Sequence, residues 1–517
     1  MNKTILDMKK VFLFLMMVLP FVSCDKNTEV AVNVELSISR NEIILDPDAS
    51  VEELVVKSST DWSINDIPQW CGTIRPSYGK AGEWTVRIRG RFYEEKADRS
   101  AVLKVVAGDK TETFTLLQRG AKIIDAKLYD SRVPSVGGQV KVNVVSDYET
   151  YSVEVVEGTE WLTTTAAETP LNGDIIFSAA QNDTDSDRTA TIRFSHSESG
   201  YVKELTVIQL CVASENRYYD GDVKLLLAAK KGKGFNIVLL GDGFIAKDLA
   251  FGGEFDKMLA TAQDAIFACE PMASLKDYVN IYAVAAESKE QGIGRVTAKN
   301  TAIRAFFRSE DPTNLTMNLD PEAAYSYMNK TGITDRVNTA VLVICNTDEV
   351  GGTNISWPDG RCLALCTKVG SNHMGVIGVI NHELVGHAIG RLDEGYVYNS
   401  GAATEEYKAT LAERHAKGWS LNIDTTDDPT QVAWKHFIGV AGYEKVGCYN
   451  FAGGVVFMGG GVCEPENHFL RQDCMVTNEL YFNAPSREQI VKHVYEQAGV
   501  EYSFEDFIAN DKLRGEH

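Results

Sequence analysis

Apolar and polar residues alternate differently in the two halves of the chain. Between about residues 30 and 213, short alternating segments are separated by turns rich in Gly, Asp, Asn and Ser. Val140, Val142 and Val144 illustrate the pattern, because every second residue of a strand faces the same side. Such segments predict an all-β region.

The all-β region contains an internal repeat. Trp70 and Trp161 are 91 residues apart, as are Gln118 and Gln209. The run Asp-Arg-Ser-Ala at 98–101 has its counterpart in Asp-Arg-Thr-Ala at 187–190. Two copies of about a hundred residues have the size of immunoglobulin-like β-sandwiches. We therefore expect one module at 25–121 and a second at 122–213.

The repeated residues resemble the BACON family of bacterial β-sandwich modules. The resemblance rests on Trp62-Ser63, Trp70, the Asp-Arg-Ser-Ala run and Gln118, with Tyr151 near the position of the first Trp in the second copy. It implies the N-terminus of a surface protein, with carbohydrate contact as one role and a spacer as the other. We favour the spacer role and expect core positions for both Trp70 and Trp161, because sandwiches commonly bury tryptophan.

Residues 218–510 predict an α/β or α+β domain. Largely apolar, strand-like runs at 235–240, 278–284 and 340–344 are typical of buried strands. A helical pattern lies between them, with Phe255, Leu259, Ala262 and Ile266 on one side. Strands that alternate with helices favour this fold class. The sequence Gly-Asp-Gly at 241–243 lacks the remainder of any phosphate-binding fingerprint, so it predicts a tight turn.

The N-terminus has the features of an export signal. Lys9 and Lys10 precede a short apolar run at 11–19, and Ser23 precedes Cys24. The run is too short to span a bilayer, and no later stretch is long enough. The segment resembles a lipobox, which implies that residues 1–24 are a lipoprotein signal and that Cys24 carries the lipid. The alternative is an ordinary signal peptide. Either places the protein outside the cytoplasm, and the first places it on the outer membrane or cell surface.

The net charge of the chain argues against nucleic acid as a partner, and its cysteine content leaves the state of the thiols open. The chain has 51 basic and 72 acidic residues, a net charge of −21, which argues against nucleic acid. Nine cysteines remain after Cys24, an odd number with irregular spacing, so at least one thiol is expected to be free. The pairs Cys362/Cys366 and Cys463/Cys474 are candidate metal ligands, with buried thiols or one disulfide as the favoured interpretation.

The segment from Asn381 to Tyr396 carries the chemistry. Zinc hydrolases commonly place His-Glu-x-x-His on a helix, where ligands at i and i+4 share a face and the Glu acts as base. Here His382-Glu383 is followed by His387 at i+5, about 140° around an ideal α-helix. A π-bulge would restore the shared face, and Gly386 would ease the distortion. The dipeptidyl peptidase III family has a similar His-Glu-Leu-Leu-Gly-His segment and binds zinc through it.

The third ligand has two candidates. His387-x-x-Gly390-x-x-Asp393 matches the second half of the metzincin pattern, in which the Gly allows a sharp turn that returns the third ligand to the metal. This spacing favours Asp393. Glu394 is the alternative. His373 and His468 are nearby histidines for which a structural or surface role is expected.

The domain as a whole resembles the IgA-peptidase family of zinc metalloendopeptidases. The resemblance rests on 240–244 (Leu-Gly-Asp-Gly-Phe), the His-Glu segment, Cys474-Met475 and 482–487 (Phe-Asn-Ala-Pro-Ser-Arg). It implies a metzincin-like fold in which Met475 forms the turn beneath the zinc. Family members carry Asp-Glu-Tyr one residue later, and an alignment on Tyr396 places Glu394 where their Asp stands.

The sequence therefore predicts two β-sandwiches followed by a zinc peptidase domain. Zn²⁺ is expected on His382, His387 and Asp393 or Glu394, with Glu383 as general base and Tyr396 or Tyr481 as candidate oxyanion donors. The expected substrate is an extracellular protein or glycoprotein. One alternative is a surface binding protein whose peptidase domain has decayed. Another is a glycan-binding lipoprotein in which the β modules make the carbohydrate contact.

Overall fold

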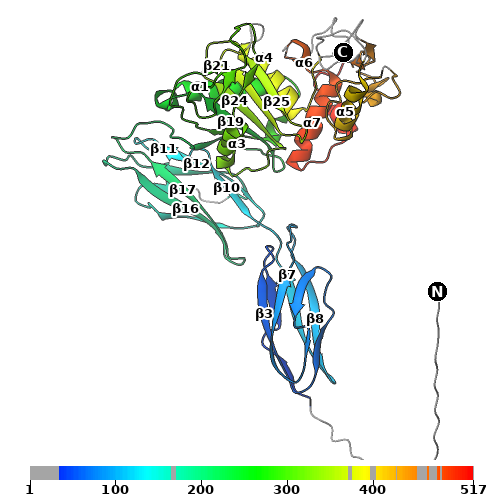
Figure 1. The fold of residues 1–517 in the computed structure, drawn as a ribbon. Helices are drawn as coiled ribbons and strands as arrows, with labels where there is room; N and C mark the ends of the chain where they lie inside the picture. The colour runs from blue at the N-terminus through cyan, green and yellow to red at the C-terminus, as the bar shows by residue number, and fades with distance from the viewer. Residues whose placement is uncertain are drawn as a thin grey trace, which may run out of the picture. The chain divides into compact units, whose positions relative to one another are not determined.

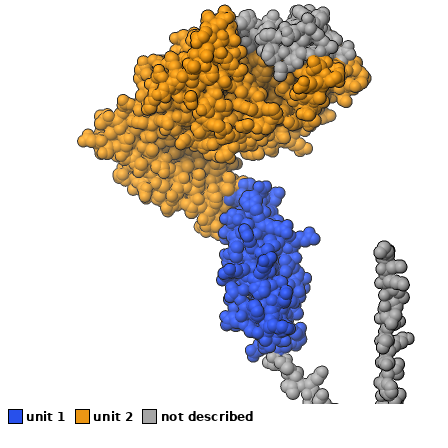
Figure 2. Space-filling view, in the orientation of Figure 1, with its two compact units in different colours: residues 1–122 blue, residues 123–517 orange. Residues whose placement is uncertain are grey.

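The computed structural model describes residues 34–164, 170–370, 375–395, 403–426, 428–450, 463–464, 474–477 and 480–515. They form two compact units, 1–122 and 123–517 (Figure 2). The proposed lipid site Cys24 lies outside the described residues, as do His373, Tyr396 and His468. Within the described ranges, no helix is both long and apolar enough to cross a membrane.

The first unit consists of two antiparallel-rich sheets that enclose one apolar core. One sheet has the order β1-β3-β7-β5 and the other β2-β9-β8-β4-β6. The strands are β1 (Leu36–Ile38), β2 (Glu42–Leu45), β3 (Val51–Ser58), β4 (Trp62–Asn65), β5 (Cys71–Arg75), β6 (Tyr78–Gly79), β7 (Gly82–Gly90), β8 (Arg99–Ala107) and β9 (Lys110–Gln118).

The second unit begins with a β module of the same kind, whose sheets have the orders β10-β12-β15-β14 and β11-β17-β16-β13. Its inward residues include Val140, Val142 and Val144, which confirms the predicted strand face. The strands are β10 (Ile124–Leu128), β11 (Arg132–Val133), β12 (Gly138–Ser146), β13 (Ser152–Glu157), β14 (Leu162–Thr164), β15 (Asn172–Ala179), β16 (Arg188–His196) and β17 (Tyr201–Gln209).

The sequence repeat marks one side-chain arrangement that occurs in both modules. In the first, the Arg99 guanidinium lies 4.8 Å from the ring centre of Trp70 and donates to Oε1 of Gln118. In the second, Arg188, Trp161 and Gln209 repeat the contact at the same 4.8 Å. Trp161 is buried as expected, but Trp70 is only half-buried. The paired positions therefore hold a cation–π contact at the border of each core.

A six-stranded sheet of order β18-β20-β19-β24-β26-β25 forms the centre of the α/β domain. Its four central strands are parallel, and β18 and β25 are antiparallel edges. The strands are β18 (Val223–Leu227), β19 (Phe235–Asp242), β20 (Val279–Val284), β24 (Thr339–Cys345), β25 (Gly352–Ser356) and β26 (Cys362–Thr367). The three apolar runs thus form strands, as predicted.

Helices cover both faces of this sheet (Figure 1). The helices α1, η4 and α7 pack on one face and α3 on the other. The predicted apolar side of α1 is buried against the sheet. The longer helices are α1 (Glu254–Ile266), α3 (Pro321–Met328), α4 (Gly375–Ile380), η4 (Asn381–Ile389), α5 (Glu405–Ala416), α7 (Ala484–Ala498) and α8 (Phe504–Asn510).

Shorter elements complete the described domain. They are η1 (Ala246–Leu249), α2 (Met272–Leu275), η2 (Lys276–Tyr278), β21 (Gly294–Arg295), β22 (Phe306–Phe307), β23 (Met317–Asn318), η3 (Asn329–Thr331), η5 (Lys435–Phe437), β27 (Tyr449–Asn450), β28 (Cys463–Glu464) and α6 (Cys474–Thr477).

The Gly-Asp-Gly segment has a structural role. Asp242 is fully buried at the end of β19, and its carboxylate accepts hydrogen bonds from the backbone N–H groups of Ile303 and Ala305, both at 2.8 Å, and from the Thr301 hydroxyl at 2.9 Å. The chain turns at Gly243, where φ is +77°. The segment therefore anchors the 301–305 loop and closes a turn, as expected for a sequence without a phosphate-binding fingerprint.

Polar contacts join the second β module to the α/β domain. The Arg132 guanidinium pairs with Asp222, and both side chains are largely buried, at 17% and 11% exposed. The Leu225 N–H donates to the Tyr129 carbonyl at 2.7 Å. Lys224 lies 3.5 Å from Asp130 of the module. This module belongs to the same compact unit as the α/β domain, which a spacer role alone does not explain.

We expect Arg132→Ala to destabilise the second unit by about 3 kcal/mol, because it leaves the buried Asp222 carboxylate without its charge partner. Lys57→Ala is the matched control in the first unit, since Lys57 and Glu83 are 60% and 62% exposed and such pairs contribute less than about 1 kcal/mol. Denaturant unfolding of both variants measures the difference. Equal losses would contradict the role of the Arg132–Asp222 pair.

Candidate metal centre

The helix that carries the histidines is a π-helix over Asn381–Ile389, continuous with α4. The N–H of Gly390 donates to the carbonyl of Val385, five residues earlier, at 2.8 Å. Five-residue hydrogen bonding places His387 one turn beyond His382. The π-helix expected from the spacing is therefore present, and it extends over the whole motif rather than a single bulge.

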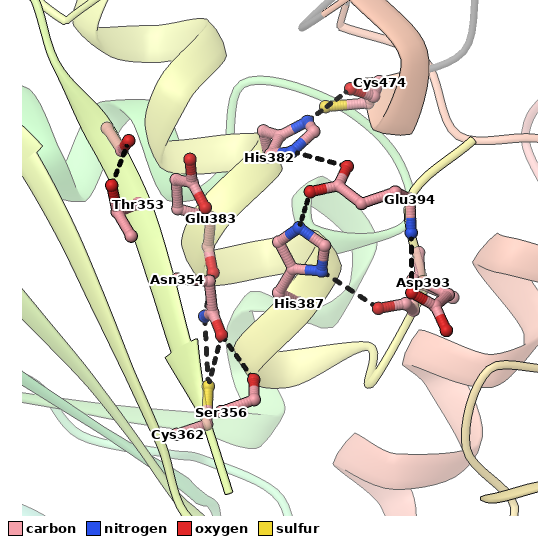
Figure 3. A network of polar contacts seen from close by, with 12 residues as sticks. Thr353, Asn354, Ser356, Cys362, His382, Glu383, His387, Asp393, Glu394 and Cys474 are labelled. Carbon is pink, nitrogen blue, oxygen red and sulfur yellow. Dashed lines mark hydrogen bonds and ion pairs between the residues drawn. The ribbon is translucent and has the colours of Figure 1, made fainter. Parts of the chain in front are cut away.

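Three side chains converge beside this helix (Figure 3). His382, His387 and Glu394 each offer a ligand atom, and these atoms lie within 4.8 Å of one another. Nε2 of His382 lies 3.2 Å from Oε2 of Glu394, and Nε2 of His387 lies 3.2 Å from Oε1. Two imidazoles and one carboxylate are a donor set that zinc prefers.

Backbone carbonyls fix both imidazole rings. Nδ1 of His382 donates to the carbonyl of Cys474 at 2.9 Å, and Nδ1 of His387 donates to that of Leu392 at 3.0 Å. A carbonyl only accepts, so each Nδ1 carries a proton, and a ring without a second proton would present an Nε2 lone pair to Glu394. The buried Oε2 of Glu394 faces Nε2 of His382 at 3.2 Å, and no other polar partner of this oxygen is found among the described residues. A cation between these atoms would satisfy all three groups.

The charges of the cluster perturb one another strongly. Burial alone would lower the pKa of His382, but the hydrogen bond and charge of Glu394 raise it to about 9. The pKa of His387 is also raised: burial opposes the rise, and the charge of Glu394 outweighs it. Burial would raise the pKa of Glu394, yet the two histidines hold it well below its usual range. The cluster thus attracts positive charge, whether as protons or as a metal ion.

The turn that follows the helix differs from the sequence expectation. Gly390 has φ −75°, and the left-handed residue is Arg391 at φ +54°. A Cβ on Gly390 would lie 2.8 Å from the carbonyl oxygen of Gly386, so this glycine is needed for close packing and not for its φ. Nε2 of Gln489, on α7, donates to the carbonyls of Gly390 and Arg391 at 2.6 and 3.0 Å. Tertiary contacts therefore hold the strained residue.

Asp393, the first choice for third ligand, does not face the histidines. Its Oδ2 lies 3.2 Å from the Arg414 guanidinium, and its Oδ1 accepts the N–H of Glu394 at 3.0 Å. Glu394, the alternative, takes the place beside both imidazoles. The metzincin spacing, counted from His387, favoured Asp393, but the left-handed Arg391 and the contacts with Asn422 and Arg414 hold Asp393 away from the rings.

Met475 lies directly beneath the π-helix. It is fully buried, and a Cβ added to Gly386 would lie 2.2 Å from its sulfur. The Met475 carbonyl accepts the N–H of Gly395 at 3.0 Å, next to Glu394. The segment with Cys474 and Met475 thus contacts both ends of the ligand set.

Glu383 lies on the side of the helix that faces β25 (Figure 3). A Cβ added to Gly352 of β25 would lie 3.2 Å from its Oε1, so this glycine leaves room for the carboxylate. Asn354 donates to the Glu383 backbone carbonyl at 2.9 Å. Burial raises the pKa of Glu383, and the two histidines only partly offset the rise. A carboxyl with a raised pKa suits proton transfer.

The cluster contains none of the other candidates among the described residues. The ring of Tyr481 is 6% exposed and lies 5.9 Å from the Arg487 guanidinium. Tyr396, His373 and His468 are not among the described residues. In the described part of the chain, Cys362 and Cys366 are buried free thiols of β26, outside the metal-type cluster.

Several residues that support the site gave no signal in the sequence. Arg414, Ser420 and Asn422 contact Asp393, and Gln489 holds the turn before it. They lie 21 to 96 residues beyond Asp393 in no recognisable motif. Only the tertiary structure brings them to the site.

The structure contains a mixed α/β domain with a His-His-Glu cluster that could hold a metal ion, preceded by β-rich modules. Residues 223–442 match the model of the IgA Peptidase M64 family. Residues 149–210 match a BACON model described as a putative N-terminal binding domain, and residues 35–121 match the viral BACON domain. These matches confirm the family resemblance and the order of the domains.

Comparisons with curated proteins and with solved structures do not extend the family matches. No curated protein matches the chain. Among solved structures, a Bacteroides ovatus GH5 xyloglucanase is 18% identical over 19% of this chain and 21% of its own, with a TM-score of 0.16. Drosophila OTK extracellular domains are 11% identical over 34% of this chain and 62% of theirs, with a TM-score of 0.23. The chain spans less than two thirds of either, and these likenesses define neither fold nor function.

The contact between Gly386 and Met475 yields a prediction. Gly386→Ala forces a methyl group into the Met475 sulfur, and we expect a loss of about 1–3 kcal/mol in unfolding free energy from overpacking. Gly447→Ala is the control, because its Cβ would meet only the Tyr449 ring at 3.3 Å or more. Denaturant unfolding compares them. A Gly386 variant as stable as the control would show that Met475 is not packed there.

Proposed function

We propose that this protein is a zinc-dependent endopeptidase that acts outside the cytoplasm. The match to a peptidase family supports a peptidase, and the convergence of His382, His387 and Glu394 carries the choice of a metal enzyme. Two imidazoles that donate to backbone carbonyls and one carboxylate, three protein ligands in all, are typical of catalytic zinc sites.

The residues present fit zinc in number, type and orientation. Each Nε2 is directed at the same small volume as Glu394, and Oε2 of Glu394 has no other polar partner among the described residues. When bound, zinc supplies Lewis acidity toward a peptide carbonyl and toward water. His382, His387 and Glu394 would hold it, and their supporting carbonyls would keep the rings in place.

Glu383 performs the proton transfers in this mechanism. It neighbours His382 on the π-helix and is directed toward β25, and we place the attacking water between the metal site and this strand. Its carboxylate accepts a proton from the attacking water and then donates it to the leaving amine. The raised pKa favours retention of that proton between the two steps.

The metzincin-like arrangement, the lipid anchor at Cys24 and surface display belong to the same proposal. The buried Met475 under the helix supports the first, and the BACON matches favour an extracellular setting. Glycoproteins are one class of substrate open to such a protein. The rival hypothesis of a decayed peptidase rested on the altered histidine spacing and on the shifted Asp-Glu pair. The π-helix accommodates the spacing, and Glu394 lies beside both histidines despite the shift.

We expect Glu383→Gln to retain zinc but to lower kcat by about 10²–10⁴-fold, because the general base is removed while the ligands stay. Glu322→Gln, an exposed glutamate of α3, is the control and should match the wild type. Proteolysis of an unfolded protein substrate and metal analysis supply the two readouts. Full activity in the Glu383 variant would remove this residue from the mechanism.

Glu394→Gln should weaken zinc binding by more than the roughly 10- to 100-fold typical of a partner outside the ligand set, because it removes a charged ligand. Competition with a chelator measures the affinity. An unchanged affinity for zinc in this variant would contradict the assignment of Glu394 as the third ligand and would favour Asp393.

A further inference from the structure

The backbone directly before Glu394 is held by a second group of residues. The N–H of Asp393 donates to Oδ1 of Asn422 at 2.9 Å, and Nδ2 of Asn422 donates to the Asp393 carbonyl at 2.8 Å. The side-chain amide of Asn422 thus binds both the backbone N–H and the backbone carbonyl of Asp393. Asn422 is 3% exposed, so water does not compete for these bonds.

The side chain of Asp393 continues this network. Oδ1 accepts the N–H of Glu394 at 3.0 Å, and Oδ2 lies 3.2 Å from Arg414 and 3.4 Å from the Ser420 hydroxyl. Asp393 therefore fixes the peptide unit that carries the proposed ligand, and Arg414 neutralises its charge. Without that neutralisation, a second carboxylate beside the cluster would repel Glu394.

Hydrogen bonds join the segment that contains Asn422 to α7 and to the turn after the π-helix. The Leu421 N–H donates to Oε1 of Gln489 at 2.7 Å, and Nε2 of the same Gln489 donates to the carbonyls of Gly390 and Arg391. The N–H of Ser420 donates to the Arg391 carbonyl at 2.8 Å. Gln489 therefore binds both the loop after α5 and the turn after the π-helix.

We propose that Asp393 and Asn422, with Arg414 as counter-charge, are positioning residues that hold Glu394 against the two histidines. This inference rests on the proposed zinc site. The two adjacent acidic residues then have different roles. Glu394 contacts the metal, and Asp393 fixes the backbone that presents Glu394. Partners of this kind raise metal affinity because they reduce the freedom that the ligand loses on binding.

The test compares zinc affinity in Asn422→Ala and Asn280→Ala. Asn280 is the matched control: it is 7% exposed and likewise accepts from one backbone N–H, that of Ala229, and donates to one backbone carbonyl, that of Lys233, far from the cluster. We expect zinc affinity to fall roughly 10- to 100-fold in the Asn422 variant and to stay near the wild-type value in the control. The absorption spectrum of the cobalt-substituted protein should shift in the Asn422 variant alone.

Asp393→Asn supplies the same comparison if Asn422→Ala does not fold, because it keeps the shape of the side chain and removes only the pairing with Arg414. Its zinc affinity should also fall. If the wild type binds zinc and neither variant loses more affinity than Asn280→Ala, the positioning role is overturned while the proposed function stands. If the wild type binds no zinc, the proposed function fails and the inference with it.

Discussion

The five-residue interval between His382 and His387 is the constraint on which the described site depends. Only a helix with i→i+5 hydrogen bonding presents both rings on one side, and Asn381–Ile389 adopts it. Such a helix is intrinsically rare, so its neighbours must stabilise it. Met475 packs on Gly386 beneath it, and Gln489 binds the turn that ends it. The geometry of the site is thus a property of the whole domain rather than of the motif.

The lone pairs and the carboxylate of the same cluster favour a bound cation. Both Nδ1 atoms are used by carbonyls, so two lone pairs and one carboxylate face each other in a buried space. Protons or a metal ion relieve the repulsion, and the low pKa of Glu394 keeps it charged for either. Glu383, directed toward β25, is not a member of this set, and we propose it for the proton transfers.

Sequence patterns predicted the strands and helices well because burial has a regular period. Val140, Val142 and Val144 show the strand period, and the apolar side of α1 shows the helical one. The π-helix was also predictable, because only it reconciles two ligands with that spacing. The choice between Asp393 and Glu394 was not, since it depends on Arg391 at positive φ and on Asn422, which lies 29 residues away. The joining of the second β module to the α/β domain through Arg132 and Asp222 likewise has no local signature.

The most direct test is a crystal structure of the zinc-loaded protein with anomalous diffraction measured at the zinc absorption edge. Our account predicts one strong anomalous peak within bonding distance of Nε2 of His382, Nε2 of His387 and the Glu394 carboxylate, with Asp393 still hydrogen-bonded to Asn422. A peak coordinated by Asp393 instead, or no peak at the two histidines, would contradict it.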